Sequence, residues 1–353
     1  MMWSSGIGSY IRYLVPYILD AYPDNRFYLL GRPQDQANWD GFQKANVSWI
    51  SMKAPIYSIF EQLEIFEKTP LETDLFWAPH YNVPVFRKSK LLVTVHDVFH
   101  LAFLSRVEGF HRRLYAKGIF KYLTKNADAI LTVSDFTRSE LIRLTDADTK
   151  KITVIHNGVD ESWFKVQFRE RPHHKPYILF VGNIKPHKNL SRLLEAFGMI
   201  RNQISHDLVL VGKKEGFLTA EGKVFVEAEK FKDRVYFSGL VDEDKLKQYY
   251  AFADLLVFPS LYEGFGLPPL EAMAIGLPTL VSRIASIPEV CGTAAEYFDP
   301  YDSKDMSIKI LKALKNETLR HELIQRGLEQ ARLFSWNQSA LKTNLIIRNL
   351  LEG

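Results

Sequence analysis

The chain of 353 residues contains a single cysteine, Cys291. One thiol cannot form an internal disulfide, and it cannot supply the several sulfur ligands of a zinc or iron–sulfur site. This scarcity is typical of proteins in a reducing compartment, and we expect a cytoplasmic location. The sequence also lacks an apolar run of about 18 residues, and its first residues lack the basic and apolar segments of a signal peptide. We therefore expect neither a membrane span nor export.

Charge of one sign is not in large excess, because 45 Lys and Arg stand against 41 Asp and Glu. We expect no nucleic-acid partner. One local bias exists between residues 101 and 126, where Glu108 is the single acid among the basic residues Arg106, Arg112, Arg113, Lys117, Lys121 and Lys125. With apolar side chains at helical spacing, the segment predicts a basic amphipathic helix or helix pair suited to the anionic inner face of the plasma membrane. The alternative is a solvated helix face above a core stripe.

The length exceeds the ~100–200 residues of one ordinary domain, so two domains are expected. Short apolar runs alternate with helical patterns in both halves, which predicts two α/β domains with buried parallel strands. The predicted strands are 27–30, 47–50, 75–77, 91–96, 129–133 and 152–155 in the first half, and 177–181, 208–211, 235–237, 255–258, 279–281 and 296–298 in the second.

A segment rich in charge, histidine and proline, 160–176, separates the two series and suits a linker. We set the domains at 1–165 and 166–335. A predicted C-terminal helix, 336–353, follows, and the first domain is its candidate packing partner.

The chain opens on the loop 4–9 and a predicted helix 10–22. An open α/β domain normally begins with a strand, and in doubly wound sheets that strand lies near the middle. We therefore expect the first strand of the N-terminal domain to be missing from this sequence, through a start site assigned too late or a truncation.

The most informative segment follows the predicted strand 255–258. It contains Gly264 and Gly266, which allow a ligand to approach the backbone, and two prolines suited to a first helical turn. Such a helix start offers N–H groups and a positive dipole end to a phosphate. Glu263 and Glu271 can accept hydrogen bonds from the hydroxyl pairs of a ribose or hexose. For either glutamate alone, the alternative is complementation of the helix dipole or a solvated loop acid.

The segment from Glu263 to Glu271, with Gly-Phe-Gly-Leu-Pro inside it, resembles the E-x7-E signature of family 4 glycosyltransferases. Segments 154–160, 180–190, 276–282 and 287–290 are similar to further motifs of that family. The resemblance covers nearly the whole chain and is strongest from 132 to 300. It implies the GT-B fold, in which two Rossmann-like domains with parallel sheets face each other across a donor-binding cleft.

The resemblance also implies a retaining transfer of a sugar from a nucleotide diphosphate. Glu271 would hold the ribose hydroxyls, and Glu263 would bond the hydroxyls of the donor sugar. Lys188 would be the cation on the diphosphate, where charge builds up as the sugar leaves. The backbone of Gly264, Phe265, Gly266 and Leu267 would help to fix the diphosphate and sugar.

The phosphate-facing loop departs from the family pattern at Asn183, where an arginine is common. Lys185 is the candidate for a second positive charge, although a lysine lacks the guanidinium fork. Contacts to the nucleotide base are expected around 211–213, which includes Lys213, and around 237–241.

In the N-terminal half, His96 ends a predicted strand, at the edge where open α/β sheets bind ligands. The resemblance implies that it positions the donor sugar and stabilises the transition state, and the alternative is a structural histidine. The loop with Gly6 and Gly8 would meet the diphosphate. Because Ile11 replaces the third glycine of G-x-G-x-x-G, a dinucleotide-binding interpretation fails. Ser134 is interpreted as a helix N-cap.

We expect no metal and no cofactor, because no Asp-x-Asp pair occurs in a suitable loop and the resemblance implies charge compensation by lysine and a helix dipole. Similarity to bacterial polysaccharide and lipopolysaccharide assembly enzymes makes GDP-mannose the first choice of donor, with UDP-glucose and dTDP-rhamnose after it. The expected acceptor is a glycan or lipid-linked glycan. The alternatives are a nucleotide-sugar epimerase and a non-catalytic sugar-nucleotide-binding protein.

Overall fold

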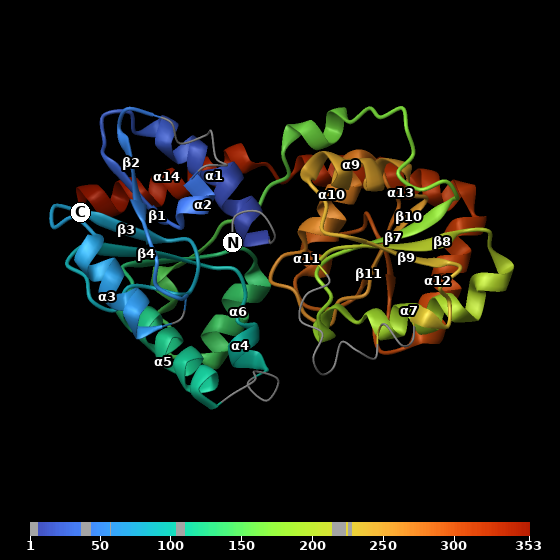
Figure 1. Cartoon of the computed structure of the whole chain (residues 1–353), viewed down its shortest axis with the longest axis horizontal. Coiled ribbons are helices and arrows are strands. Elements are labelled where there is room, and N and C mark those ends of the chain that lie inside the picture. Colours follow the sequence, from blue (N-terminus) through green and yellow to red (C-terminus); the bar gives the residue numbers. More distant parts are fainter. Residues whose placement is uncertain (1–5, 37–43, 57, 104–109, 214–223, 225–227) are drawn as a thin grey trace. The chain divides into compact units, whose positions relative to one another are not determined.

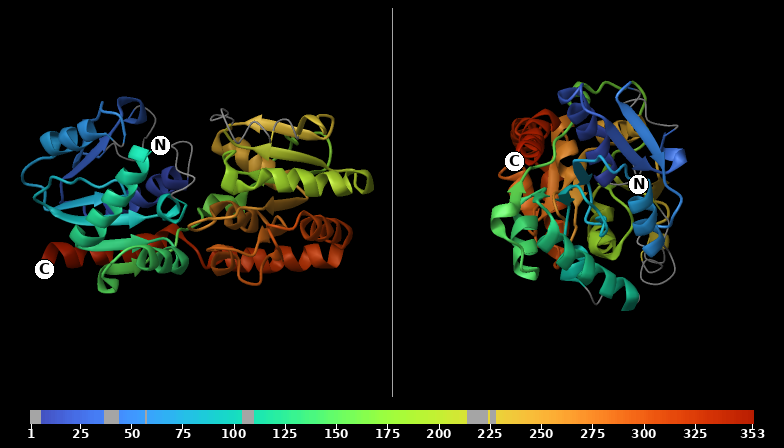
Figure 2. Two further views of the ribbon diagram at one scale, coloured as in Figure 1. Left: turned by 90° about the horizontal axis from the view of Figure 1, so that it is seen from below. Right: turned by 90° about the vertical axis from the view of Figure 1, so that its left-hand side faces the viewer.

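The computed structural model describes residues 6–36, 44–56, 58–103, 110–213, 224 and 228–353. The chain forms two compact units, the first containing the residues up to Gly158 together with Trp336–Gly353, and the second Val159–Ser335. The first unit ends at Gly158, whereas the sequence predicted a boundary after residue 165. The C-terminal helix belongs to the first unit. In both units helices flank parallel strands (Figures 1 and 2).

The first unit alternates strands and helices along the chain. Its strands are β1 (Phe27–Gly31), β2 (Val47–Ser51), β3 (Leu75–Ala78), β4 (Lys90–Val95), β5 (Ala129–Thr132) and β6 (Ile152–Val154). Its helices are α1 (Gly6–Ala21), α2 (Pro33–Gln36), α3 (Ile59–Lys68), α4 (Phe99–Ala102), α5 (Phe110–Asn126), α6 (Asp135–Leu144), the 3-10 helix η3 (Thr149–Lys151) and α14 (Trp336–Glu352).

Among the described residues of this unit, the strands lie in two parallel sheets, β1–β2 and β3–β4–β5–β6. Helix α1 packs on both sheets, because Val15 and Leu19 are buried against Leu29 of β1 and Trp77 of β3.

The C-terminal helix α14 is anchored to α1. The Trp336 ring lies 5.9 Å from the Tyr10 ring and stacks on Tyr13 at 5.8 Å. Further along, the Tyr22 hydroxyl donates to the Asn344 carbonyl at 2.9 Å. The end of the chain therefore becomes part of the first core.

The second unit holds one parallel sheet in the order β12–β11–β10–β7–β8–β9. Its strands are β7 (Tyr177–Val181), β8 (Asp207–Val211), β9 (Val235–Gly239), β10 (Leu255–Phe258), β11 (Thr279–Ser282) and β12 (Glu296–Phe298). Its helices are α7 (Leu190–Ile200), α9 (Glu243–Phe252), α10 (Leu267–Ile275), α11 (Ile287–Cys291), α12 (Ser303–Lys315), α13 (Glu317–Arg332) and the 3-10 helices η4 (Glu161–Lys165), η5 (Pro186–Lys188) and η6 (Arg201–Gln203).

Helices cover both faces of this sheet, with α7 and α12 on one face and α9, α10 and α13 on the other (Figure 1). Strands β7, β8, β10 and β11 are buried throughout, which explains their unbroken apolar sequences. The strand predictions are confirmed in both units. No helix in the described part of the chain combines the length and the apolar character needed to cross a bilayer.

One prediction for the first unit needs correction. Helix α1 begins at Gly6, whereas the sequence analysis placed a loop before a helix at residue 10. Gly6 and Gly8 therefore lie in the first turn of α1. Glycine has a low helix propensity, which explains why the local sequence favours a loop.

Gly212 sets the spacing between the loops that follow β7 and β8. The Gly182 amide donates to the Val211 carbonyl at 2.9 Å, and the Gly212 amide donates to Gly239 at 3.0 Å. At Gly212 the angle φ is +155°, and a Cβ there would lie 2.0 Å from the Gly182 carbonyl oxygen. Only glycine fits this contact.

We expect Gly212→Ala to lower the free energy of unfolding by about 1–3 kcal/mol, because the new methyl group forces two backbone loops apart. Gly118→Ala is the matched control, since a Cβ there meets nothing within 4 Å, and it should stabilise helix α5 by up to about 1 kcal/mol. Thermal and urea unfolding measure both. Equal stability of the two variants would contradict the packing argument.

Candidate active site

Lys188 and Glu263, predicted from separate motifs of the second unit, form one ion pair. Lys188 ends the turn η5 after β7, and Glu263 lies in the loop after β10. Their Nζ and Oε1 atoms are 2.6 Å apart, and each side chain is only 15% exposed. A hydrogen bond between two charged groups in such a place is short and strong. The carboxyl edge of the sheet thus carries an ordered cation beside an ordered anion.

The loop around Lys188 is held by the buried side chain of Asn189. Its Nδ2 donates to the carbonyls of Pro259 at 3.0 Å and Pro300 at 2.8 Å. The amide of Leu261 also donates to the His187 carbonyl at 2.7 Å. The loops after β7, β10 and β12 are therefore joined, and Lys188 is fixed opposite Glu263.

Ser286 holds the loop of Glu263 from the other side. Its Oγ lies 3.0 Å from the Glu263 carbonyl oxygen and 2.9 Å from that of Phe265. The Ser282 hydroxyl similarly donates to Ser260 at 2.6 Å. Ser286 was not predicted from the sequence, although a small hydroxyl residue directly before Ile287-Pro288-Glu289 was the available signal.

The segment from Gly264 to Leu267 packs against the core of the second unit, and its first three residues are buried. Phe265 is 4% exposed, and its ring lies edge-on to Phe334 at 5.7 Å. Gly266 caps α10 with φ +109°, and a Cβ there would lie 2.7 Å from the Ile287 side chain. Leu267 is the first residue of α10. The helix therefore starts at the end of β10, with its positive dipole end beside Glu263.

Glu271 lies one turn further along α10 and contacts a residue that the sequence analysis missed. The Tyr250 hydroxyl of α9 lies 2.9 Å from Oε2 of Glu271. Tyr250 is fully buried, and burial, with the Glu271 charge adding to it, raises the pKa of its hydroxyl well above the usual range. The carboxylate thus has a permanent hydrogen-bond donor.

The remaining residues of the second unit that were predicted to bind the nucleotide-sugar donor lie on the loops after β7 and β8. The Asn183 side-chain oxygen accepts from the Lys213 amide at 3.4 Å, which connects these two loops. Lys185 precedes η5, is exposed and makes no ion pair within the described part of the chain. The structure brings Asn183 and Lys213 together, whereas Lys185 faces solvent.

In the first unit, His96 directly follows β4, as predicted. Its Nε2 lies 2.9 Å from the Pro79 carbonyl, so this nitrogen carries the proton. The ring lies edge-on to Tyr10 at 4.8 Å, and the Tyr10 hydroxyl bonds Thr94. Burial lowers the pKa of His96, against a smaller opposing effect of the Pro79 hydrogen bond. The ring is therefore neutral at physiological pH.

Two further histidines lie at the same edge of this unit, and the sequence assigned no role to either of them. His80 follows β3, and its Nδ1 accepts from the Asn82 amide at 3.4 Å. Burial, with His96 and His100 adding their charges, lowers the pKa of His80 to about 3. His100 contacts the Tyr81 hydroxyl at 3.1 Å. The position of His80 after a strand was the same signal that identified His96.

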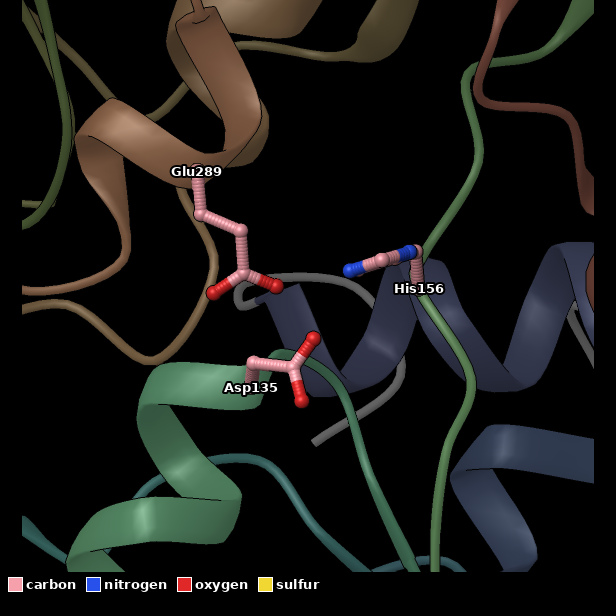
Figure 3. A group of neighbouring side chains, drawn as sticks. All are labelled: Asp135, His156 and Glu289. Atoms are coloured by element: carbon pink, nitrogen blue, oxygen red, sulfur yellow. The ribbon is translucent and has the colours of Figure 1, made fainter.

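Asp135 begins α6, and the preceding Ser134 accepts from the Thr137 amide at 3.0 Å, which confirms the predicted N-cap. Figure 3 shows Asp135 with His156, from the segment after β6, and their ligand atoms lie within 4.8 Å of each other. Two side chains are fewer than a structural zinc site requires. Glu289, also drawn there, belongs to α11 of the second unit. The expectation of no metal and no cofactor stays a prediction.

Comparisons with known proteins identify the family. Residues 161–330 match the family model of glycosyl transferases group 1, and residues 71–163 match that of glycosyltransferase family 4. The O-antigen chain mannosyltransferase B of Escherichia coli is 30% identical over 282 residues, which cover 76% of this chain and 72% of that protein. The O-antigen chain mannosyltransferase RfbU of Salmonella typhimurium is 31% identical over 261 residues, covering 74% and 69%.

The crystal structure of Anabaena HepE in complex with UDP-glucose superimposes with a TM-score of 0.78 and covers 98% of this chain and 96% of that one. The two sequences are 15% identical, so this likeness concerns the fold alone. It confirms the predicted GT-B class.

The buried histidines predict a pH dependence of stability in the first unit. The unfolded chain binds protons on histidine below pH ~6.5, whereas folded His80 stays neutral down to about pH 3. The unfolded state then binds more protons, so the free energy of unfolding falls as the pH falls, by about 1.4 kcal/mol per pH unit for such a histidine. Chemical unfolding between pH 6.5 and 5 measures this slope.

We expect His80→Gln to reduce the slope. His321→Gln, which replaces an exposed histidine, is the control and should keep the wild-type slope. A slope unchanged by His80→Gln would show that His80 is not held neutral.

Proposed function

This chain belongs to family 4 of the glycosyltransferases, and we propose that it transfers mannose from GDP-mannose, with retention of configuration, to a hydroxyl of a glycan or lipid-linked acceptor. The observation that carries this proposal is the Lys188–Glu263 pair at 2.6 Å beside the start of α10. These groups lie at the carboxyl edge of one sheet. The cation and the helix N-terminus suit the diphosphate of a nucleotide sugar, and the carboxylate suits the hydroxyls of its sugar. Membership of the family also removes the epimerase alternative.

Each charged group has a separate task in the proposed reaction. The bond between the anomeric carbon and the diphosphate oxygen breaks, so negative charge grows on the leaving phosphate. Lys188 and the positive end of α10 stabilise that charge because they are in place before it develops. Glu263 pairs with Lys188 through Oε1 and offers Oε2 to a hydroxyl of the donor sugar.

The nucleotide side of the donor rests on Glu271 and on the loops after β8 and β9. Glu271 accepts hydrogen bonds from the ribose hydroxyls, and the loop of Lys213 lies along the base. The mannosyltransferase names of relatives at 30–31% identity support GDP-mannose as donor. The UDP-glucose complex of HepE supports a nucleotide sugar of this general class, so UDP-glucose and dTDP-rhamnose belong in the same assay.

In the first unit, His96 enters the proposal as a residue that transfer requires. Its ring is neutral with the proton on Nε2, which leaves Nδ1 as an acceptor for a sugar hydroxyl. The acceptor hydroxyl loses its proton during transfer. In the proposed reaction the leaving phosphate oxygen accepts this proton, so the protein does not need to supply a general base.

The first unit also carries features suited to an anionic membrane. Residues 104–109 of the basic segment lie outside the described part of the chain. On α5, Lys117, Lys121 and Lys125 are exposed and make no ion pair with any described residue. Because lysines at this spacing share one helix face, they suit anionic headgroups.

Exposed apolar side chains on α3 complement these lysines. Ile59, Phe60, Leu63 and Phe66 are 49–70% exposed. The Phe66 ring contacts Phe86 at 6.2 Å, and the neighbouring Val85 carbonyl accepts from Tyr122 of α5, which connects the two helices. Exposed apolar and basic side chains on two linked helices favour a membrane surface as the partner.

We expect GDP-mannose to support turnover, and we expect two glutamate variants to separate binding from transfer. Glu271→Ala should weaken nucleotide binding by about ten- to a hundredfold, because it removes hydrogen bonds to the ribose. Glu263→Gln should mainly lower kcat, by about tenfold or more, because its contact is to the transferred sugar. Calorimetry and product analysis across the three donors measure these effects.

Wild-type behaviour of either variant would contradict the role proposed for the glutamate that it replaces. Transfer from UDP-glucose or dTDP-rhamnose in place of GDP-mannose would be consistent with the family but would contradict GDP-mannose as the donor. The exposed Glu317→Gln substitution, on α13, is the matched control and should change neither constant.

For the membrane contact, we expect binding to vesicles with anionic lipid that weakens as salt increases. Substitution of Lys117, Lys121 and Lys125 by Glu reverses three charges. It should lower the partition coefficient onto anionic vesicles at least a hundredfold, since each basic side chain contributes about 1 kcal/mol to membrane binding. The control reverses three exposed lysines of the second unit, Lys230, Lys304 and Lys315, with the same change in net charge. Equal binding to neutral vesicles would contradict the contact.

A further inference from the structure

Tyr250 of α9 contacts the candidate site residue Glu271, and the sequence did not predict this contact. Its Oη lies 2.9 Å from Oε2 of Glu271 and 3.3 Å from the Pro268 carbonyl oxygen. Both partners belong to the first turns of α10. One hydroxyl therefore links α9 to the part of α10 that carries the ribose-binding carboxylate.

The direction of this hydrogen bond is fixed by chemistry. A carboxylate and a carbonyl only accept, so the Tyr250 hydroxyl must donate. Burial and the nearby Glu271 charge both raise the pKa of Tyr250, so the hydroxyl keeps its proton at physiological pH. Glu271 consequently meets an unchanging donor.

The Tyr250 ring is itself held in place. Trp163, in the 3-10 helix η4, is 3% exposed and lies edge-on to it at 5.3 Å. Lys247 covers the Trp163 ring, with Nζ 5.4 Å from the ring centre, and also bonds the Ser162 hydroxyl at 2.7 Å. The hydroxyl of Tyr250 thus occupies one position relative to α10.

We propose that Tyr250 is a positioning residue for the nucleotide, whose hydroxyl holds the Glu271 carboxylate in the orientation that receives the ribose hydroxyls of the donor. The inference rests on the proposed function, in which Glu271 binds the ribose. A glutamate side chain has several rotatable bonds, and ordering it on binding costs free energy. Because Tyr250 orders the carboxylate in advance, that cost does not fall on the nucleotide.

The test is Tyr250→Phe, which removes one oxygen atom and keeps the ring against Trp163. We expect the Kd of GDP and the KM of the sugar donor to rise about tenfold, the effect of losing a hydrogen bond to a charged group. We expect kcat to stay within about twofold, because the contact is equally present in the ground state and the transition state.

Tyr177→Phe is a closely matched control. Tyr177 is also fully buried in the second unit, and its hydroxyl donates to the Tyr249 carbonyl at 2.6 Å, on the same helix α9. Both variants lose one buried hydrogen bond of a tyrosine, so both should lower Tm by a similar amount. Only Tyr250→Phe should raise Kd and KM.

The double variant Tyr250→Phe/Glu271→Ala completes the experiment. If Tyr250 acts through Glu271, the double variant binds GDP as weakly as Glu271→Ala alone. Additive losses, or a Kd for Tyr250→Phe equal to that of Tyr177→Phe, would overturn the inference while the weak binding of Glu271→Ala upheld the proposed function. Wild-type binding by Glu271→Ala would instead overturn the role of Glu271 and, with it, both proposals.

Discussion

The geometry of the second unit depends on one buried amide, that of Asn189. Its two Nδ2 protons bond the carbonyls of Pro259 and Pro300, and its backbone adopts φ 60°, a left-handed conformation that asparagine tolerates better than most residues. Replacing it with an apolar side chain would leave two buried carbonyls without these partners, which is costly. Because Lys188 is the preceding residue, the same amide that joins three strand-end loops also aims the cation at Glu263.

The Lys188–Glu263 pair resolves a conflict between stability and function. A sugar diphosphate needs a cation that is already in place and poorly hydrated, but an isolated buried charge is expensive. Pairing with Glu263 keeps Lys188 compensated in a place where both side chains are 15% exposed and the Phe258 ring lies 5.4 Å below the ammonium group. In the proposed reaction, a diphosphate shares the ammonium group without a large rearrangement, and the carboxylate remains close enough for a sugar hydroxyl.

Local patterns in the sequence predict the strands, because a buried parallel strand is an apolar run of fixed length, and they indicate the candidate site residues, because the family motifs are contiguous. They do not predict what holds those residues. Tyr250 and Glu271, or Ser286 and Glu263, come from separate elements, and a hydrogen bond between separate elements leaves no periodic trace. The start of α1 was misplaced for the opposite reason, since a local rule on glycine was overridden by packing of that helix on two sheets.

Burial also decides which kind of chemistry the histidine of the first unit can perform. A general base works best with a pKa near the operating pH. Desolvation lowers the pKa of His96, and its Nε2 proton is engaged by the Pro79 carbonyl, so the ring is a weak base with one fixed tautomer. Such a group orients hydroxyls well and removes protons poorly. A transfer in which the leaving phosphate accepts the proton requires only the first of these abilities, and Tyr250, permanently protonated against Glu271, meets the same demand for fixed hydrogen-bond roles in the second unit.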